Sequence, residues 1–521
     1  MAAELTSDAA TSPQGSTARL DSLTSWHADW SALRVAVLGL GVTGFAVADT
    51  LTELGAKVLV LAPEPDDDRA RILEVIGAEL LRHPLDSVPA GLAEFAPELI
   101  VASPGFHPDH PVLEWAGETG TPVWGDIELA WRVRDKVNAA EWILVTGTNG
   151  KTTTVQLTAT FLAANGLRAA PCGNIGVPVL DAVRDPGGFD VLVVELSSYQ
   201  LHHLPTIGPG ALHPWASVCL NVADDHLDWH GSAEAYRSAK GTVYANTKVA
   251  CVYNRGDEAT EQMVRDADVE EGARAIGFGL DVPGPSDFGV VEGILCDRAF
   301  LEERQTSALE IVTVPELERH GLAAPHVVAN ILAASALARS FGVPVEVIHD
   351  ALRDFRLDAH RIETVAVAGG IRWIDDSKAT NPHAAEASLR AFGQVVWIVG
   401  GLLKGVDADA LVASHAPRLR AAIVIGVDRT ELVAAFARHA PALPVFEVDA
   451  DDTEHVMPEA VALAAAVAGE GDTVLLAPAA ASMDQFADYA DRGRRFHDAV
   501  IAQLGGEADG DPAPQEPPSE G

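Results

Sequence analysis

Short runs of apolar, β-branched residues recur along the chain, and polar or Ala/Leu-rich stretches separate them. The runs are continuous rather than alternating, which is typical of parallel strands that are buried on both faces. Strands that alternate with helical stretches indicate an α/β architecture. We predict strands at 34–40, 57–62, 99–103, 142–147, 190–196, 216–222, 248–253, 371–376, 395–401, 421–426 and 472–478.

The two ends of the chain differ in composition from the part between them. The first ~30 residues are small, polar and rich in Ala, Ser and Thr, and the tail GGEADGDPAPQEPPSEG is rich in Pro, Gly and acid, so both are predicted to be disordered. At roughly 100–200 residues per domain, 521 residues allow about three domains. We predict an extension at 1–30, domains at 31–137, 138–358 and 359–504, and an acidic tail at 505–521.

Charge and cysteine content restrict the function classes. The net charge is −39, from 36 basic against 75 acidic residues. This argues against a nucleic-acid or anionic-membrane partner, because both need a basic face. Four cysteines without a Cys-x-x-Cys pair make a zinc site or disulfide framework unexpected and fit a reducing cytoplasm. The N-terminus lacks the pattern of a signal peptide, and no apolar run reaches the ~20 residues that span a bilayer.

A glycine-rich turn follows the first predicted strand. Gly39, Gly41 and Gly44 match G-x-G-x-x-G, which lets a backbone approach a pyrophosphate at a helix N-terminus. The dinucleotide fingerprint also requires an acid at the tip of the second strand, and this strand ends in Leu61-Ala62-Pro63. A nicotinamide dinucleotide is therefore disfavoured. A different pyrophosphate, such as a UDP-sugar, and a purely structural turn both remain open.

A second glycine loop has the order of a phosphate-binding loop. TGTNGKTT at 146–153 follows the strand WILV and precedes the helical stretch VQLTATFLAAN. Backbone N–H groups of such a loop cradle phosphates, while Lys151 would reach the β- and γ-phosphates and Thr152 would bind Mg²⁺. The strict Walker pattern requires Gly where this chain has Val145, so the match is to the variant G-T-N-G-K-T.

Three further residues suggest cation and phosphate chemistry. Glu195 closes an apolar strand, where a carboxylate is costly unless it holds a cation, although it could also cap a helix. His226 lies in an acidic turn, which favours a metal, although a lone His is usually structural. Lysine is rare relative to arginine, so a retained Lys240 suggests a compact charge or a reactive amine, although it could also be a lysine on a helix surface.

GTNGKTT, GNIG at 173–176, VVELSSYQL at 193–201, DDHLDWHG at 224–231 and YRSAK at 236–240 resemble the Mur ligase superfamily, which includes folylpolyglutamate synthases. The resemblance runs from about residue 34 to 503. DDSKATNPHA at 375–384 and APAAASMDQFADYADRGRRF at 477–496 are similar to the members that add D-glutamate. The resemblance implies three domains: a Rossmann-like UDP-binding domain, a central ATPase domain with a mostly parallel sheet, and a C-terminal Rossmann-like domain.

The reaction that the resemblance implies belongs to peptidoglycan precursor synthesis. ATP phosphorylates the carboxylate of UDP-N-acetylmuramoyl-L-alanine, and the D-glutamate amine then attacks the acyl phosphate. The resemblance also implies a cytoplasmic monomer that uses ATP and two Mg²⁺ ions and carries a carbamate on Lys240. In such a reaction a carboxylate attacks a phosphate, and the two anions repel each other. The site therefore needs aligned positive charges.

The resemblance assigns roles residue by residue. The implied catalytic residues are Lys151, Glu195, His226, Lys240 and Lys378, and the implied metal ligands are Thr152, Glu195, His226 and Lys240. The implied ATP contacts are Gly147, Thr148, Asn149, Gly150, Lys151, Thr152, Thr153, Asn330, Arg361 and Asp376. The implied UDP-substrate contacts are Val42, Thr43, Ser103, Asn174 and His226, and the implied D-glutamate contacts are Thr380, Lys404, Ser482 and Tyr489.

One family feature is replaced in this chain: Asp-Thr-Arg after the second strand becomes Ala62-Pro63-Glu64, so contacts at that edge must differ. The alternatives are another Mur ligase, which the DSKATN motif disfavours, and a folylpolyglutamate synthase, which the complete UDP-type first domain disfavours. A non-catalytic nucleotide switch would not need Glu195, His226 and Lys240 together.

Overall fold

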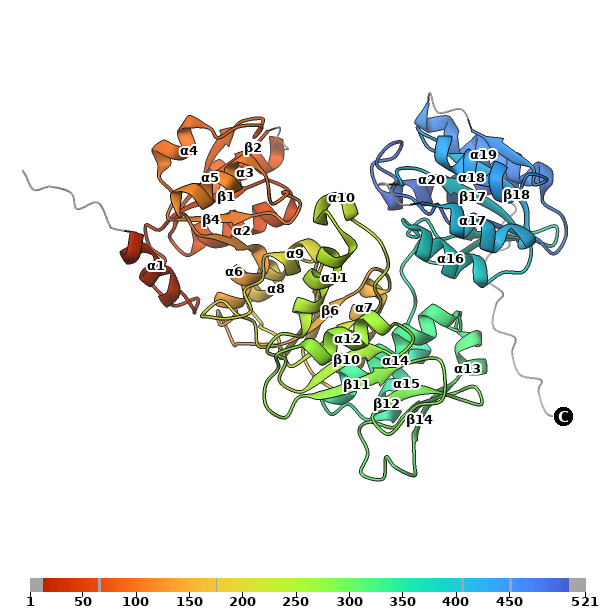
Figure 1. Cartoon of the computed structure of the whole chain (residues 1–521), viewed down its shortest axis with the longest axis horizontal. Coiled ribbons are helices and arrows are strands. Elements are labelled where there is room, and N and C mark those ends of the chain that lie inside the picture. Colours follow the sequence, from red (N-terminus) through yellow and green to blue (C-terminus); the bar gives the residue numbers. More distant parts are fainter. Residues whose placement is uncertain (1–12, 64–66, 175, 404–406, 449–451, 506–521) are drawn as a thin grey trace, which may run out of the picture. The chain divides into compact units, whose positions relative to one another are not determined.

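The computed structural model of the chain describes residues 13–63, 67–174, 176–403, 407–448 and 452–505, and Figure 1 labels many of their helices and strands. The described chain forms two compact units. The first comprises the residues up to Val222, Glu234–Ala323 and Val327–Phe355, and the second comprises Ala223–Ala233, Ala324–His326 and the residues from Arg356. Among the described helices, none has both the length and the apolar composition needed to cross a membrane.

The first sheet has five parallel strands in the order β3-β2-β1-β4-β5, and its central strands are buried. This order places the glycine turn after β1 at the carboxyl edge of the sheet, where the loop after β4 also lies. The strands are β1 (Arg34–Leu38), β2 (Lys57–Ala62), β3 (Glu79–Arg82), β4 (Leu99–Ala102) and β5 (Val123–Gly125). The helices are α2 (Val42–Glu53), α3 (Asp67–Ile76), α4 (Ala90–Phe95), α5 (Pro111–Thr119) and α6 (Asp126–Arg132).

The second sheet has nine strands in the order β14-β13-β12-β11-β10-β9-β6-β8-β7. The strands from β12 to β7 in this order are parallel, and β13 pairs antiparallel with both β12 and β14. Buried parallel strands explain the continuous apolar runs. The strands are β6 (Glu141–Thr146), β7 (Ala169–Gly173), β8 (Val191–Glu195), β9 (Ala216–Cys219), β10 (Ala250–Asn254), β11 (Arg274–Phe278), β12 (Asp287–Val291), β13 (Ile294–Asp297) and β14 (Leu309–Thr313).

The helices around the second sheet include α7, which opens at the phosphate loop, and α14, whose apolar residues are buried on all sides. They are α7 (Lys151–Ala164), α8 (Val179–Arg184), α9 (Ser198–His202), α11 (Ala233–Gly241), α12 (Glu258–Asp266), α13 (Val314–Arg319), α14 (Pro325–Ser340) and α15 (Val345–Asp354), with a 3₁₀ turn at Thr242–Tyr244. The short helix α10 (Leu227–His230) carries the residues after His226 and belongs to the second unit.

The third sheet has six strands in the order β15-β16-β20-β17-β18-β19, of which only β15 is antiparallel. The strands are β15 (Glu363–Ala368), β16 (Ile371–Asp375), β17 (Val395–Gly400), β18 (Leu419–Ile425), β19 (Val445–Glu447) and β20 (Thr473–Leu476). The helices are α16 (Pro382–Arg390), α17 (Asp409–His415), α18 (Thr430–His439), α19 (Thr453–Val467) and α20 (Tyr489–Gln503), with a 3₁₀ turn at Ala416–Arg418.

The α/β class and every strand range predicted from the apolar runs are confirmed, with ends that shift by a few residues. The strands that the pattern did not predict are mostly short or lie toward sheet edges: β3, β5, β7, β11, β12, β13, β14, β15 and β19. Edge strands have one face or one side in solvent, so their sequences lack the continuous apolar run.

The prediction that residues 1–30 form a disordered extension is wrong for its second half. Helix α1 spans Pro13–Ser22, and Leu20, Leu23 and Trp30 are almost completely buried. The guanidinium of Arg132 in α6 donates to the carbonyls of Leu20 and Leu23 at 3.2 and 3.1 Å. A few apolar anchors were enough to order the segment, although its average composition is polar. Residues 1–12 and most of the predicted tail lie outside the described residues.

Candidate active site

The phosphate loop joins β6 to α7, and its glycines adopt backbone conformations that other residues rarely take. Gly147 has φ 151° and Gly150 has φ 84°. A Cβ on Gly150 would lie 2.4 Å from Oδ1 of Asn330, so both the backbone and the space require glycine there. This places Asn330, a predicted nucleotide contact on α14, directly beside the loop.

Asn221 holds the loop in shape, and sequence reasoning did not identify it. Its carbonyl accepts from N–H of Thr148 at 2.9 Å, its Oδ1 accepts from N–H of Asn149 at 2.8 Å, and its Nδ2 donates to the Asn149 carbonyl at 3.0 Å. Asn221 is the next-to-last residue of the predicted strand run ASVCLNV, so a polar residue near the carboxyl end of a strand was the available signal. The loop is therefore preorganised by a neighbouring strand end.

The loop opens a helix whose N-terminus has no side-chain cap. Gly150 is the N-cap of α7 and offers no side-chain acceptor to the first N–H groups. Such groups, together with the helix dipole, favour an anion. Lys151 Nζ lies on the loop and donates to the carbonyls of Gly147 and Thr148 at 2.9 and 3.0 Å. Thr152 and Thr153 are buried in the first turn. The geometry suits a nucleoside triphosphate tail.

Lys240 lies on α11 and is buried beneath the same loop, with 2% of its surface exposed. Its Nζ donates to the Gly147 carbonyl at 2.9 Å and to Thr146 Oγ1 at 3.4 Å, and it lies 4.8 Å from the ring centroid of Tyr236. The Tyr236 hydroxyl in turn contacts Thr148 Oγ1 at 2.9 Å. Lys240 is therefore a buried lysine that contacts the phosphate loop, and it is not a surface lysine.

Glu195 ends β8 next to the loop and fits a cation. Its side chain is 1% exposed, and its carboxylate accepts a long hydrogen bond from Asn174 Nδ2 at 3.4 Å. A buried carboxylate with so little neutralisation is costly unless a cation balances it. Carboxylate and hydroxyl oxygens are the ligands that Mg²⁺ prefers, so Glu195 and Thr152 fit that ion. The main chain of Asn174 also donates to the Glu195 carbonyl at 3.0 Å.

His226 lies in the second unit, on the segment Ala223–Ala233. It has φ 54°, and its main-chain N–H donates to Asp225 Oδ1 at 2.9 Å. Its ring Nε2 lies 3.6 Å from Asp225 Oδ2. The first unit therefore brings together Lys151, Glu195 and Lys240, while the metal role of His226 stays a prediction.

The glycine turn after β1 has the shape that a pyrophosphate site needs. Gly39 has φ 90°, and a Cβ on Gly44 would lie 2.0 Å from the Gly39 carbonyl oxygen. Ser103 Oγ, from the loop after β4, lies within 3.1 Å of both Cβ positions and is buried without a hydrogen-bond partner among the described residues. Such an atom is costly unless a ligand satisfies it. Val42 is exposed, and Thr43 is partly exposed at the N-terminus of α2.

In the second unit, Asp376 follows β16 and is buried. Its carboxylate accepts from the Ser388 hydroxyl and from N–H of Ile362, the latter at 3.3 Å. Burial raises the pKa of Asp376 to about 6, against the opposing effects of Ser388 and Arg361. Burial and the nearby Arg361 lower the pKa of His326 to about 4. The predicted nucleotide residues Asp376 and Arg361 therefore lie together.

Arg492 holds the DSKATN motif (376–381) against the loop that follows β20 and carries Ser482; sequence reasoning quoted Arg492 in a motif without assigning it a role. Arg492 is fully buried and donates to Ser377 Oγ, to the Ser377 carbonyl and to the Ala480 carbonyl at 3.0, 2.8 and 3.1 Å. Lys378 Nζ lies 5.1 Å from the Tyr489 ring centroid. Ser482 is buried and Thr380 is half-buried near these loops. Lys404 and Glu64 lie outside the described residues.

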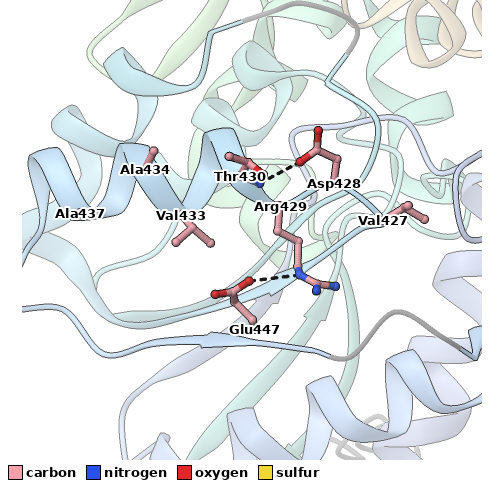
Figure 2. A pocket seen from close by; sticks show the side chains of 8 residues that line it. All are labelled: Val427, Asp428, Arg429, Thr430, Val433, Ala434, Ala437 and Glu447. Atoms are coloured by element: carbon pink, nitrogen blue, oxygen red, sulfur yellow. Dashed lines mark hydrogen bonds and ion pairs between the residues drawn. The ribbon is translucent and has the colours of Figure 1, made fainter.

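Two other features of the second unit resemble ligand sites. His360, Glu363 and Asp375 lie close enough to hold a metal ion, but hydrogen bonds already join them: His360 Nδ1 to Asp375 at 2.6 Å and His360 N–H to Glu363 at 2.8 Å. Asp375 raises the pKa of His360. A cavity of about 440 Å³ lies beside α18, where Arg429 pairs with Glu447, and Figure 2 shows the side chains that line it. Of the predicted site residues that the structure describes, none lines that cavity.

Two family models match parts of this chain. Residues 145–338 match the Mur ligase middle domain, and residues 360–480 match the Mur ligase glutamate ligase domain. These ranges contain the phosphate loop, Glu195, Lys240 and the DSKATN motif. The chain belongs to the Mur ligase family, whose members are ATP-dependent amide ligases.

Relatives with curated names resemble the chain over almost its whole length. A UDP-N-acetylmuramoylalanine–D-glutamate ligase of Leifsonia xyli subsp. xyli is 67% identical and covers 96% of this chain and 99% of its own. The enzymes with the same name from Streptomyces avermitilis and Tropheryma whipplei are 54% and 49% identical, and cover 91% and 92% of this chain and 98% of their own.

Solved structures share the fold at low sequence identity. The UDP-N-acetylmuramate-alanine ligase MurC of Thermotoga maritima has a TM-score of 0.53 at 19% identity and covers 90% of this chain and 99% of its own. The MurF ligase of the same organism, solved in complex with ADP, has a TM-score of 0.52 at 18% identity and covers 87% and 96%. These likenesses confirm an α/β fold with mostly parallel sheets.

Proposed function

We propose that this protein ligates D-glutamate to UDP-N-acetylmuramoyl-L-alanine in peptidoglycan precursor synthesis, with ATP as the energy source and an acyl phosphate as intermediate. The observation that carries this proposal is the 67% identity to a D-glutamate ligase over 96% of the chain. The matched part of the chain contains the motifs at 375–384 and 477–496. The phosphate loop, Glu195 and Lys240 supply the matching geometry in the first unit.

The loop 147–153 would bind the phosphates of ATP through its backbone N–H groups and the uncapped N-terminus of α7. Lys151 would turn from the loop carbonyls to the β- and γ-phosphates, since its flexible stem allows that movement. Asn330, beside Gly150, and the pair Arg361 and Asp376 in the second unit would contact the rest of the nucleotide. Positive charge from Lys151 would stabilise the phosphate charge that grows in the transition state.

Thr152, Glu195, Lys240 and His226 would hold two Mg²⁺ ions, which supply Lewis-acid stabilisation of the reacting oxygens. Glu195 supports this role because it is buried and, among the described residues, its carboxylate accepts one long hydrogen bond, from Asn174 Nδ2. Lys240 would carry a carbamate, because an ammonium repels Mg²⁺ whereas a carbamate oxygen is a hard anionic ligand. Its burial favours the neutral amine that reacts with CO₂.

Val42, Thr43, Ser103 and Asn174 would hold the UDP-linked substrate, together with His226. The unsatisfied Ser103 Oγ at the glycine turn supports this assignment, because a substrate oxygen would give it a partner. Thr380, Lys404, Ser482 and Tyr489 would bind D-glutamate, and Lys378 would bring charge to the phosphates. Two carboxylates on the amino acid need cationic and hydroxyl donors, which these side chains offer.

We also propose that the three sheets correspond to three domains at about 31–137, 138–358 and 359–504, and that the protein works in the cytoplasm as a monomer. One substrate of the proposed reaction carries a UDP group and another is ATP. We expect both compounds in the cytoplasm. The Arg132 contacts to Leu20 and Leu23 extend the first domain toward the N-terminus.

The test is phosphate release from ATP in the presence of UDP-N-acetylmuramoyl-L-alanine and each of D-glutamate, L-glutamate, L-lysine and meso-diaminopimelate. We expect release to depend on D-glutamate and to yield the corresponding dipeptide product by mass spectrometry. Release that depends on another amino acid would assign the chain to another Mur ligase, and release with a folate substrate would assign it to the folylpolyglutamate synthases.

A further inference from the structure

Asp126, the first residue of α6, is a buried carboxylate that the proposed reaction does not use. It is 8% exposed, and its Oδ2 accepts from Nε2 of Gln200 at 2.9 Å. Burial raises the pKa of Asp126 to about 6, while hydrogen bonds from Gln200 and from the N–H groups of residues 126 and 127 oppose that rise. Each of these three partners is a donor, so the carboxylate serves as an acceptor toward all of them.

Gln200, the partner on α9, has its amide orientation fixed at both ends. Its Nε2 faces Asp126, while its Oε1 accepts from N–H and Oγ of Ser197 at 3.0 and 3.1 Å. The Gln200 N–H donates back to Ser197 Oγ at 3.2 Å, which completes a capping box for α9. Reversing the amide would place a donor against the Ser197 N–H, so Asp126 sets which end of the amide caps the helix.

Ser197 lies two residues after Glu195, in the main chain that continues from β8. The residue between them is tied to β6: Leu196 N–H donates to the Val145 carbonyl at 2.9 Å, and Thr146 Oγ1 donates to the Leu196 carbonyl at 2.8 Å. Movement of the Ser197 turn would therefore strain the end of the strand that carries the Glu195 carboxylate. On the other side, Asp126 directly follows β5, at the carboxyl edge of the first sheet.

We propose that Asp126 is a positioning residue for ligation: it fixes Gln200, and through Ser197 it fixes the main chain that presents Glu195 to the metal and phosphates. The inference rests on the proposed function in taking Glu195 as a metal ligand. A chain of hydrogen bonds within the first unit would thereby connect the first sheet, through Asp126 after β5, to the end of β8, which carries Glu195. Groups that support a metal ligand affect metal affinity and activity, because a ligand must be held within a few tenths of an ångström.

The experiment uses a charge-exchanged pair in the full-length protein. Gln200→Glu places two carboxylates against each other in a buried site. Asp126→Asn replaces one acceptor oxygen of the carboxylate with an NH₂ donor, although the partners of this side chain are all donors. In the double variant, the new amide at position 126 can donate to the new carboxylate at position 200, which still accepts from Ser197, so the chain of hydrogen bonds is complete again. Restoration by the double variant would show that the pair, and not either side chain alone, matters.

Three quantities are measured: the affinity for Mn²⁺ in the presence of ADP, kcat, and the KM for UDP-N-acetylmuramoyl-L-alanine. We expect Gln200→Glu to weaken Mn²⁺ binding and lower kcat by about 10–100-fold, the range typical of residues that support a metal ligand. Asp126→Asn should produce a smaller loss in the same direction. The double variant should recover most of both quantities, and the KM for the muramoyl substrate should change less than kcat.

The matched control is Gln262→Glu. Gln262 Nε2 donates to Asp266 Oδ1 at 2.9 Å on α12. This is also a glutamine–aspartate pair at the same distance, but both side chains are exposed. We expect this control to leave Mn²⁺ affinity and kcat unchanged. Thermal unfolding of each variant reports stability separately.

Two results would overturn the proposal. One is that Gln200→Glu and Asp126→Asn lower the unfolding midpoint but leave Mn²⁺ affinity and kcat at the wild-type values, since the pair would then be structural only. The other is a double variant no better than Gln200→Glu. The Mn²⁺ measurement needs no amino-acid substrate, so failure of the wild type to use D-glutamate would count against the proposed function and not against this inference.

Discussion

Arg492 donates three hydrogen bonds that tie Ser377 to Ala480, and it is completely buried while doing so. Ser377 belongs to the DSKATN motif and Ala480 precedes Ser482, so one guanidinium fixes the separation of the two loops that carry the predicted D-glutamate residues. Burial lowers the pKa of Arg492 to about 10, which leaves it charged at neutral pH. The planar fork of an arginine matches three acceptors that a lysine could not reach together.

We expect Arg492→Met to destabilise the second unit, because two carbonyls lose a charged donor. Hydrogen bonds to charged groups contribute about 1.5–3 kcal/mol each, so a fall of several degrees in the unfolding midpoint is expected. The D-glutamate KM should rise as the loops separate. Arg495→Met on the same helix removes two partly exposed ion pairs, to Glu454 and Asp491, and should change the midpoint little. Equal midpoints for both variants would contradict the role of Arg492.

The phosphate loop gives a test of its glycine requirement. Gly150→Ala introduces a side chain at φ 84° and brings Cβ to 2.4 Å from Asn330 Oδ1. We expect the ATP KM to rise about tenfold or more, because shifts of ~1 Å at a reacting site can cost on the order of 10²-fold. The control is Gly166→Ala, which has φ 86° and open space around its Cβ position. A loss of ATP affinity in the control as well would assign the effect to backbone strain alone.

Lys240 gives a test of the carbamate proposal. Lys240→Ala should lower kcat by on the order of 10²-fold or more, since a metal ligand beside the phosphates is lost. Lys240→Arg should not restore activity, because a guanidinium keeps its positive charge. Added formate or acetate should recover part of the activity of Lys240→Ala by placing an anion in the vacated space.

Lys248→Ala is the control for Lys240, because Lys248 is partly exposed and pairs with Glu141 at 2.8 Å. We expect it to retain activity with or without added carboxylate. Activity of Lys240→Ala that does not respond to carboxylates, together with an unmodified lysine by mass measurement at neutral pH, would contradict the carbamate.

The pH dependence of stability tests the burial of Asp376. Burial raises the pKa of this carboxyl to about 6 from an ordinary 3.8, so the folded state holds its proton longer than the unfolded state. The contribution of Asp376 to the free energy of unfolding should therefore fall as the pH rises from about 4 to about 6, and stay constant above that window. The two pKa values bound this contribution at about 3 kcal/mol.

The measurement for Asp376 compares thermal unfolding of the wild type and Asp376→Asn across that pH range. Asp126 titrates in the same window, so the difference between the two proteins, rather than either curve, isolates Asp376. The variant should lack the decline that Asp376 contributes. Parallel curves for the two proteins would show that Asp376 is not held protonated by burial.

The sequence determined the elements that depend on local pattern. Continuous apolar runs marked the buried parallel strands, such as β6 and β17, because residues buried on both faces must all be apolar. The loop 146–153 could also be predicted from local sequence, because a strand, a glycine loop and a helix must follow one another to present backbone N–H groups. Lys151, Glu195 and Lys240 were selected in this way, and the structure brings them together in one unit.

Only the tertiary structure decided which distant side chains support these groups. Asn221 supports the phosphate loop, Arg492 joins two motifs, and Asp126 orients Gln200. The partners of these three residues lie 72 to 115 positions away in the chain, except that Arg492 also contacts the nearby Ala480. No local pattern encodes such pairs, because a hydrogen bond depends on where folding places donor and acceptor and not on their spacing in the chain. The ordered N-terminal segment has the same cause: Leu20 and Trp30 are buried by a surface that exists only after the first sheet has formed.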